Sequence, residues 1–176
     1  MSAGGSSAAR VAVVMGVSGS GKTTLARALA SAWGATFLDA DDFHSEQAKA
    51  LMASGQPLTD AMRQPWVERI AADLARRVAA GENVTLAFSG LRRAHRDMLR
   101  QAGLPLQFLF LHGEAELIAS RMRARSDHYM PVCLLDSQFA ALEPPHDEAD
   151  VARIAVELAP DAQLRCALDA LGVAAG

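Results

Sequence analysis

A glycine-rich stretch near the N-terminus constrains the fold more than any other feature of the sequence. Residues 16–23 read GVSGSGKT and match the pattern G-x-x-x-x-G-K-[ST] at every fixed position. The stretch follows the apolar run 11–15, which is typical of a strand buried on both faces. It precedes an apolar stripe at helical spacing that ends at Gly34. A strand, this loop and a helix, in that order, are the context in which the pattern binds phosphate.

The residues of this phosphate loop, or P-loop, predict how a nucleotide is held. Backbone N–H groups turn inward around the phosphate oxygens, and the following helix points its positive end at them. We expect Lys22 to reach the β- and γ-phosphates and the Thr23 hydroxyl to bind Mg²⁺. The alternative is a glycine-rich turn that binds nothing. The residues predicted to contact the nucleotide are Gly16, Val17, Ser18, Gly19, Ser20, Gly21, Lys22, Thr23 and Thr24.

Predicted strands alternate with predicted helices along the rest of the chain. Such alternation favours parallel pairing through right-handed crossovers, and hence an α/β fold with a three-layer α/β/α sandwich and a five-stranded parallel sheet. Pro65 is expected to open a long amphipathic helix. Residues 1–10 read as a flexible tail and 11–176 as a single domain. The later strands are expected at 36–39, 84–88, 106–111 and 153–157.

Composition and charge narrow the class of protein. The 176-residue chain has a net charge of −3 and no basic run longer than a pair of arginines, which argues against a nucleic-acid or anionic-membrane surface. No segment approaches the roughly 20 apolar residues that span a bilayer, and the N-terminus lacks the pattern of a secretory signal. We therefore expect a cytoplasmic protein that acts on a small molecule. Cys133 and Cys166 are interpreted as reduced packing residues.

Two aspartates suggest which P-loop class this is. A small-molecule kinase, a GTPase-like switch and a partner-driving ATPase are all compatible with the loop, but no N-K-x-D stretch reads guanine and the chain is short for a motor. Asp39 and Asp41 lie two residues apart after a predicted strand, so their side chains can face one site at the carboxyl edge of the sheet. Asp39 could hold a magnesium-bound water and Asp41 could accept the proton of an attacking hydroxyl. The alternative is a solvated acidic turn with Asp42 as a helix cap.

Several blocks resemble the gluconokinase family, small P-loop enzymes that phosphorylate gluconate. The blocks, kept in order and spacing, are MGVSGSGKT at 15–23, DDFH at 41–44, GQPLTD at 55–60 with RQPW at 63–66, RDMLR at 96–100, HY at 128–129 and LLDSQF at 134–139 with LE at 142–143. The resemblance implies a fold like that of nucleoside monophosphate kinases, with an acceptor-binding segment at about 41–66 and a lid at about 121–138. It implies ATP and Mg²⁺ as cofactors, conversion of D-gluconate to 6-phosphogluconate, and a possible homodimer.

Residues within these blocks are candidates for binding the sugar acid. His44 and Arg63 lie outside the apolar stripes, and the planar guanidinium of Arg63 suits a carboxylate. Arg96 could bind the acid, although a solvated helix face is the alternative. Gln138 is implied by the resemblance alone. Trp66 falls on the apolar stripe of its helix and is expected in the core.

The lid segment carries two arginines on one helical face. Arg121 and Arg125 are four residues apart, so both could neutralise charge on the transferring phosphoryl group. The alternative is that they form surface ion pairs with Glu114 or Glu116.

The chain departs from the family pattern at positions that could set the acceptor. Ser45, Ala48, Leu51 and Met62 stand where the family has Pro, Asn, Lys and Asp. If these positions face the sugar acid, gluconate binds less tightly here. A kinase for another small polyol or acid, such as a shikimate-like one, and a non-catalytic nucleotide-dependent regulatory module are the alternative functions.

Overall fold

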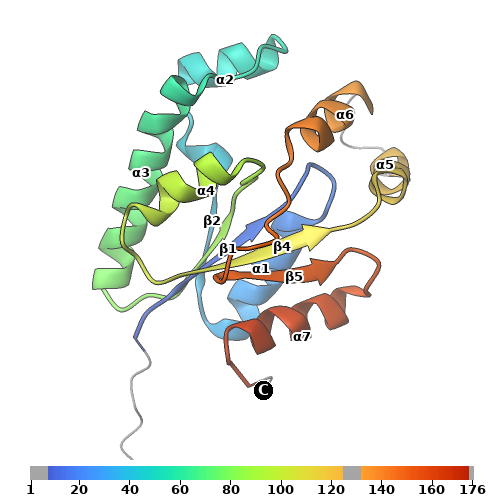
Figure 1. Cartoon of the computed structure of the whole chain (residues 1–176). Coiled ribbons are helices and arrows are strands. Elements are labelled where there is room, and N and C mark those ends of the chain that lie inside the picture. The colour runs from blue at the N-terminus through green and yellow to red at the C-terminus, as the bar shows by residue number, and fades with distance from the viewer. Residues whose placement is uncertain (1–7, 125–131, 175–176) are drawn as a thin grey trace, which may run out of the picture.

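The strands of the sheet run parallel, in the order β2-β3-β1-β4-β5 (Figure 1). The computed structural model describes residues 8–124 and 132–174, and the following elements belong to those ranges. The strands are β1 (Val11–Met15), β2 (Thr36–Asp39), β3 (Val84–Ala87), β4 (Leu106–His112) and β5 (Val151–Ala155). The helices are α1 (Lys22–Trp33), the 3-10 helix η1 (Ala40–Phe43), α2 (Glu46–Ala53), α3 (Asp60–Ala79), α4 (Arg93–Arg100), α5 (Ala115–Ala124), α6 (Val132–Ala141) and α7 (Pro160–Ala170).

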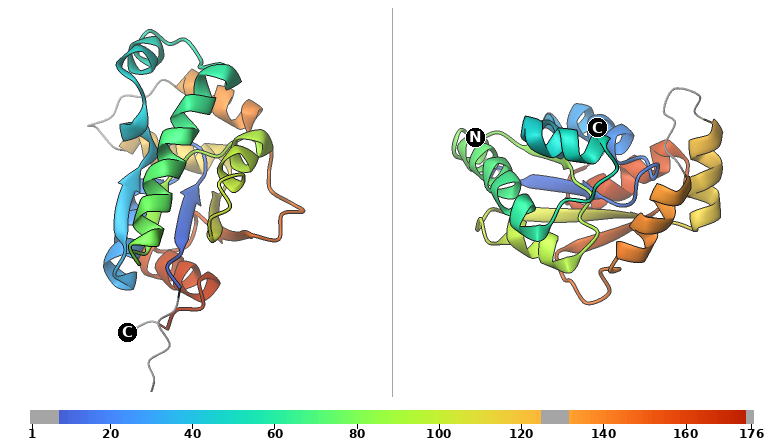
Figure 2. Two further views of the ribbon diagram at one scale, coloured as in Figure 1. Left: turned by 90° about the vertical axis from the view of Figure 1, so that its left-hand side faces the viewer. Right: turned by 90° about the horizontal axis from the view of Figure 1, so that it is seen from above.

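Strand β1 is the centre of the sheet, and both of its faces are buried. Val11 pairs with Val84 of β3 on one side and with Leu106 of β4 on the other. Helices α1 and α7 cover one face and α3 and α4 cover the other, so the molecule has three layers (Figure 2). The predicted fold class is confirmed. Because all strands run the same way, the segments that follow β1, β2 and β3 meet at one edge of the sheet.

Among the boundaries that differ from the predictions are those of α3 and β5, and one residue of the predicted tail belongs to the fold. Helix α3 begins at Asp60 rather than at Pro65, because the Thr59 hydroxyl caps it by accepting a hydrogen bond from the Met62 N–H (3.2 Å). Strand β5 spans Val151–Ala155 rather than 153–157. Arg10, which was predicted to belong to the flexible tail, is hydrogen-bonded to the start of β3. Its N–H donates to Asn83 Oδ1 (3.0 Å) and its carbonyl accepts from the Val84 N–H (3.0 Å).

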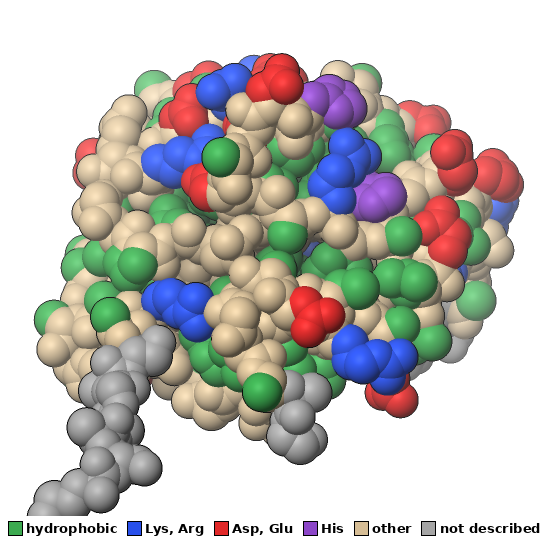
Figure 3. All heavy atoms as spheres, turned by 60° about the horizontal axis from the view of Figure 1, so that its bottom comes forward, with side chains coloured by type: hydrophobic (Ala, Val, Ile, Leu, Met, Phe, Trp, Pro, Cys, Tyr) green, Lys and Arg blue, Asp and Glu red, His purple; other side chains and the backbone are tan. Residues whose placement is uncertain are grey.

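The face of the molecule shown in Figure 3 mixes acidic and basic side chains among apolar and neutral ones, and basic side chains do not gather there. Among the residues that the structure describes, no helix is both long enough and apolar enough to cross a membrane.

Candidate active site

The P-loop follows β1 and leads into α1, as the sequence predicts (Figure 1). Its path depends on glycines with positive φ, among them Gly16 (152°) and Gly19 (80°). A Cβ atom on Gly16 would lie 2.8 Å from the Leu111 carbonyl oxygen and 2.9 Å from Ser20 Oγ. The Ser20 hydroxyl donates to the Val17 carbonyl (2.7 Å) inside the loop. The loop therefore has a defined shape that larger residues at these positions would disrupt.

Lys22 begins α1 and carries a largely buried ammonium group. Its Nζ donates to the Val17 carbonyl of the same loop (3.1 Å). Burial lowers the pKa of Lys22, and the charges of Asp41 and Asp39 offset part of that shift. A buried cation with a carbonyl as its hydrogen-bond partner is stabilised by any anion that enters the loop. The site is therefore suited to phosphate.

The two aspartates beyond β2 have different roles in the local structure. Asp39 ends the strand, and its Oδ1 accepts from the Asp41 N–H (3.0 Å), so it caps η1. The sequence had suggested Asp42 as a helix cap, which is wrong because Asp39 caps η1 and Ser45 caps α2. Burial raises the pKa of Asp39, while the side chain of Asp41 is 85% exposed. Strand β3 separates β2 from β1, so the aspartates lie about 10 Å across the sheet edge from the P-loop strand.

His44 lies directly after η1 in an apolar setting. Its ring stacks on Trp66, with centroids 4.3 Å apart, and Trp66 stacks in turn on Phe88. Burial lowers the pKa of His44, and nearby positive charges lower it further, so the ring is neutral at neutral pH. Its Nε2 lies 3.9 Å from Asp41 Oδ1, and its buried Nδ1 has no hydrogen-bond partner within residues 8–124 and 132–174. An unpaired buried nitrogen of this kind is suited to a hydroxyl group.

Trp66 is buried in the core as predicted, and it also fixes the turn that carries the aspartates. Its Nε1–H donates to the Ala40 carbonyl (2.7 Å), 26 residues away. This bond ties α3 to η1, so the positions of Asp41 and His44 depend on the packing of α3.

The first turns of α3 and α4 bring charged groups together next to this turn. His95 of α4 and Asp60 of α3 lie 3.0 Å apart (Nε2 to Oδ1). The hydrogen bond from His95 lowers the pKa of Asp60, and burial lowers that of His95 despite the carboxylate. Burial also lowers the pKa of Arg63, and the neighbouring charge of Arg92 adds to that shift. Two arginines near one exposed carboxylate leave positive charge that can accommodate a further acid group.

Arg96 is engaged within the protein rather than directed at an acceptor. Its side chain is 1% exposed, and its Nε donates to Glu148 Oε2 (2.9 Å), a carboxylate that is itself 3% exposed. The remaining guanidinium nitrogens donate to the carbonyls of Gly90 (2.6 Å) and Glu143 (3.1 Å). The alternative that Arg96 lies on a solvated helix face is wrong. The predicted contact with the substrate acid has no free donor either, because the guanidinium nitrogens already donate within the protein. Nothing in the sequence points to Glu148 as the partner of Arg96, because Glu148 lies 52 residues away in an irregular loop.

Gln138 lies at the P-loop, not beside the acceptor residues. Its Oε1 accepts from the Ser18 N–H (2.6 Å), and its Nε2 donates to Ser18 Oγ (2.8 Å). Both ends of its amide group are therefore used by one residue of the nucleotide loop. The resemblance pointed to the position, but nothing in the sequence identified the partner.

The lid arginines are only partly described. Arg121 donates from Nη1 to the Val156 carbonyl beyond β5 (2.6 Å). Within the described ranges Arg121 pairs with neither Glu114 nor Glu116, and Glu116 pairs with Arg123 instead (3.1 Å), so the ion-pair alternative is wrong for Arg121. Arg125 lies outside the described residues, as do positions 125–131 of the predicted lid.

Two of the four departures from the family pattern have local structural explanations. Ser45 caps α2, because its Oγ accepts from the Ala48 N–H (3.1 Å), a bond that proline could not offer. Ala48 is buried against the core. Leu51 and Met62 are half-buried, and nothing in the structure explains why they replace polar residues.

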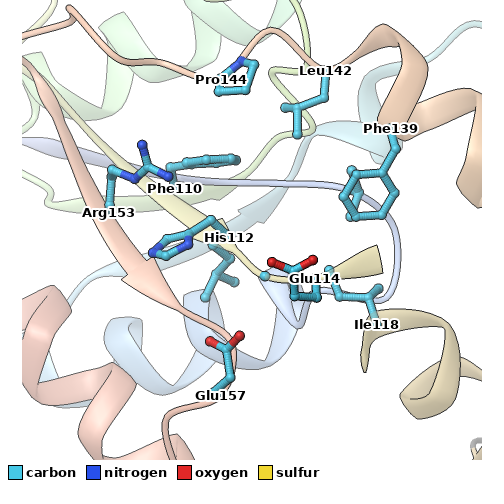
Figure 4. Close-up of a pocket in the computed structure, with 12 residues that line it drawn as sticks. Phe110, His112, Glu114, Ile118, Phe139, Leu142, Pro144, Arg153 and Glu157 are labelled. Carbon is cyan, nitrogen blue, oxygen red and sulfur yellow. The ribbon is translucent and has the colours of Figure 1, made fainter. Parts of the chain in front are cut away.

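A cavity of about 360 Å³ lies behind the P-loop, between the ends of β4 and β5 and the helices α5 and α6 (Figure 4). Phe110, Phe139 and Leu142 form its apolar wall, and Arg153 and Glu157 lie on the β5 side. Val17 lines it, whereas Lys22, Asp41 and Arg63 do not. Sequence reasoning did not find this cavity, because its walls come from five separate segments.

A metal ion at this site would have few protein ligands and would take its other ligands from the phosphates of the nucleotide. Within the described ranges, no group of three or more His, Cys, Asp or Glu residues forms a metal cluster. Mg²⁺ in phosphoryl-transfer sites takes one or two protein oxygens together with phosphates and water. The Thr23 hydroxyl at the start of α1 and the Asp39 carboxylate are oxygen donors of this kind, so the residues present fit such an ion.

Comparison with known proteins identifies the family. Residues 11–145 match the family model described as an AAA domain. A gluconokinase from Gluconobacter oxydans (strain 621H) is 42% identical over 155 residues, which cover 88% of this chain and 87% of the relative. The chain belongs to the gluconokinase family.

Solved structures show the same likeness. A gluconokinase from Sinorhizobium meliloti 1021 superposes with a TM-score of 0.83 at 39% identity, over 94% of this chain and 92% of the other. A sugar kinase from Janibacter sp. HTCC2649 superposes with a TM-score of 0.87 at 42% identity, over 94% of this chain and 96% of the kinase. The resemblance inferred from the sequence is confirmed, so this chain has the P-loop kinase fold of the gluconokinase family over nearly its whole length.

Proposed function

We propose that this protein transfers the γ-phosphoryl group of ATP to the 6-hydroxyl of D-gluconate. The observation that carries the proposal is the pairing of a complete P-loop with an acidic turn at the same sheet edge, in a chain about 40% identical to gluconokinases over most of its length. Phosphoryl transfer requires mainly positioning and charge neutralisation, and this edge offers a buried ammonium, two carboxylates and a neutral imidazole.

On the nucleotide side, the P-loop amides and Lys22 bind the phosphates. Lys22 now donates to the Val17 carbonyl, a neutral partner that a phosphate oxygen can replace with gain of charge pairing. Mg²⁺ would be held by Thr23 and Asp39, and it neutralises developing charge when bound. Arg121 and Arg125 remain candidates for stabilising the transferring group, and Arg121 would have to leave the Val156 carbonyl to do so.

On the acceptor side, Asp41 orients the attacking hydroxyl and accepts its proton. His44 can hold a neighbouring hydroxyl through its unpaired Nδ1. Arg63, with Arg92 close by, binds the carboxylate of the sugar acid, and the bond between His95 and Asp60 holds α3 and α4 in register around it. Arg96 and Gln138 bind partners within the protein and are not among the acceptor contacts.

A coupled assay of ADP release tests the proposal. The purified protein is given ATP and Mg²⁺ with gluconate, with other sugar acids or with shikimate, and with no acceptor. We expect turnover that depends on gluconate and yields 6-phosphogluconate. Faster turnover with another acid would mean that this acid, rather than gluconate, is the acceptor. ATP binding without turnover on any acid would favour a regulatory module.

Homodimer formation stays a prediction, which the molar mass in solution tests separately.

A further inference from the structure

The tip of the P-loop is hydrogen-bonded to a side chain of helix α6, which comes much later in the sequence. The Ser18 N–H donates to Gln138 Oε1 (2.6 Å), and Gln138 Nε2 donates to Ser18 Oγ (2.8 Å). The two residues are 120 positions apart. A primary amide can accept from a backbone N–H through its oxygen and donate to a hydroxyl through its nitrogen at the same time.

The other backbone hydrogen bonds of the loop fix its start and close a turn around its tip, but neither involves a polar group of Ser18. The Gly16 N–H donates to the Ser89 carbonyl (3.2 Å), and the Ser20 N–H donates to the Val17 carbonyl (3.2 Å). In the part of the chain that the structure describes, the hydrogen bonds of the Ser18 N–H and hydroxyl are the two with Gln138. The pair of hydrogen bonds between Ser18 and Gln138, called the clamp below, is therefore the polar anchor of the tip.

Packing from helix α5 limits the tip on its other side. A Cβ atom on Gly19 would lie 2.7 Å from Met122 Sδ and 3.4 Å from Ile118 Cγ2. Gly19 is thus pressed against α5 while Ser18 is held by α6, so two helices that come late in the chain define the path of the nucleotide loop.

We propose that Gln138 is a positioning residue, which holds the P-loop tip in the conformation that receives the phosphates of ATP. This inference rests on the proposed function, in which the P-loop is the ATP site. A loop held in its bound shape loses less conformational freedom when the ligand arrives, so ATP binds more tightly. Gln138 acts through Ser18 and touches neither ATP nor the sugar acid.

The test compares Gln138→Leu, Ser18→Ala and the double variant, with Ser137→Ala as the matched control. The Ser137 hydroxyl donates to the Leu134 carbonyl of its own helix (2.8 Å), one residue from the clamp. For each variant the dissociation constant for ATP is measured by calorimetry, the KM for gluconate by kinetics, and the Tm by calorimetric unfolding. If wild type binds ATP but does not phosphorylate gluconate, the proposed function fails, while the ATP measurements still decide the role of Gln138.

We expect Gln138→Leu to weaken ATP binding about tenfold, the factor that corresponds to the loss of one or two hydrogen bonds. Ser18→Ala keeps the backbone bond and should cost about threefold. The double variant should match Gln138→Leu alone, because the Ser18 hydroxyl has then already lost its partner. Ser137→Ala should bind ATP as wild type does.

Three results would overturn the proposal. A higher KM for gluconate with unchanged ATP binding would mean that Gln138 acts on the acceptor side. A lower Tm with normal ATP binding would make the clamp merely structural. Fully additive effects of the two single changes would show that the residues act independently. If Gln138→Leu does not fold, Gln138→Glu replaces it: its negative charge should weaken ATP binding at neutral pH and less so as the pH falls, and no change at any pH would likewise overturn the proposal.

Discussion

The two halves of the site, the P-loop and the acceptor side, are constructed differently. The P-loop is one contiguous segment whose glycines and internal hydrogen bonds give it a defined shape before any ligand binds. The acceptor side is assembled from η1, α3 and α4, with Asp41 exposed and His44 left with an unpaired nitrogen. Phosphate binding therefore depends on one contiguous loop whose tip is positioned by α5 and α6, whereas acceptor recognition depends on how three separate elements pack together.

The electrostatics of the two halves differ in the same way. Lys22 is buried, and the nearby carboxylates only partly offset the cost to its charge, so the P-loop is prepared for a polyanion. On the acceptor side, the positive charge of Arg63 lies near Asp60 and Arg92, and a single carboxylate can be added there. Loss of the buried charge of Lys22 or of the proton acceptor Asp41 should affect the rate most, whereas loss of the acceptor-side cation Arg63 should affect substrate affinity.

The largest effect is expected from Lys22→Ala. Removing the buried ammonium should lower kcat/KM by about 10³-fold or more, because its charge stabilises the transition state. The fold should persist, since Lys22 forms a single hydrogen bond within its own loop. Steady-state kinetics and the unfolding midpoint check both points. Lys49→Ala, a change of the other lysine in the sequence, is the control and should leave the rate unaltered. Near-normal turnover of Lys22→Ala would contradict the P-loop assignment.

Asp41→Asn should lower kcat by about 10²- to 10³-fold while ATP binding stays close to that of wild type. The amide keeps the shape of the carboxylate but cannot accept the proton of the hydroxyl. Asp42→Asn changes the adjacent exposed carboxylate and serves as the control. If ATP affinity falls and the rate at saturating ATP survives, Asp41 belongs to the nucleotide side and the division between the two halves is wrong.

Arg63→Ala should raise the KM for gluconate by about ten- to a hundredfold, because a charge-assisted bond to the carboxylate is lost. The KM for ATP should not change. Arg76→Ala, near the other end of α3, removes an exposed arginine that pairs with Asp73 and is the matched control. An equal rise in both KM values would mean that Arg63 supports the fold of the site rather than the acceptor.

Leu51→Lys restores the family's residue at a half-buried position of α2. If this position faces the sugar acid, the KM for gluconate should fall by up to about tenfold, the worth of one charge-assisted bond. ATP binding should be unaffected. We use this single change because Ala48 is buried and a larger residue there would disturb packing. An unchanged KM would show that the departure has no bearing on the acceptor.

The smallest effect concerns stability against pH. Burial lowers the pKa of His44 below its usual 6.5, and the charges of Arg63, Arg69 and Lys49 lower it further. The unfolded chain therefore binds this proton more readily than the folded protein. The contribution of His44 to the free energy of unfolding is complete above about pH 6.5 and is lost as the pH falls through that value toward the folded-state pKa.

His44→Asn should consequently reduce the loss of stability between about pH 7 and about pH 5. Urea unfolding of both proteins at several pH values measures it. The raised pKa of Asp39 is common to both, so their difference isolates His44. Identical slopes would mean that His44 is not held neutral in the fold.

Local sequence patterns were enough to predict the phosphate side and the architecture. The residues of the P-loop act as neighbours along the chain, and strand–helix alternation leaves few ways to build a parallel sheet. Boundaries were less well predicted where a cap decides them, as at Thr59, since a hydroxyl that accepts one backbone N–H can extend a helix beyond its apolar stripe.

What the sequence determined by itself was the chemistry available: a P-loop with its lysine, an acidic turn after the second strand, and arginines in the acceptor and lid segments. Which of these polar groups face a ligand was decided by tertiary structure. Arg96 lies against Glu148 and Gln138 against Ser18, partners 52 and 120 residues away. The physical reason is that polar groups withdrawn from water are paired in most cases with whichever donor or acceptor packing brings to them, however distant in sequence. Packing therefore engaged Arg96 and Gln138 within the protein and left Asp41 and His44 available to the acceptor.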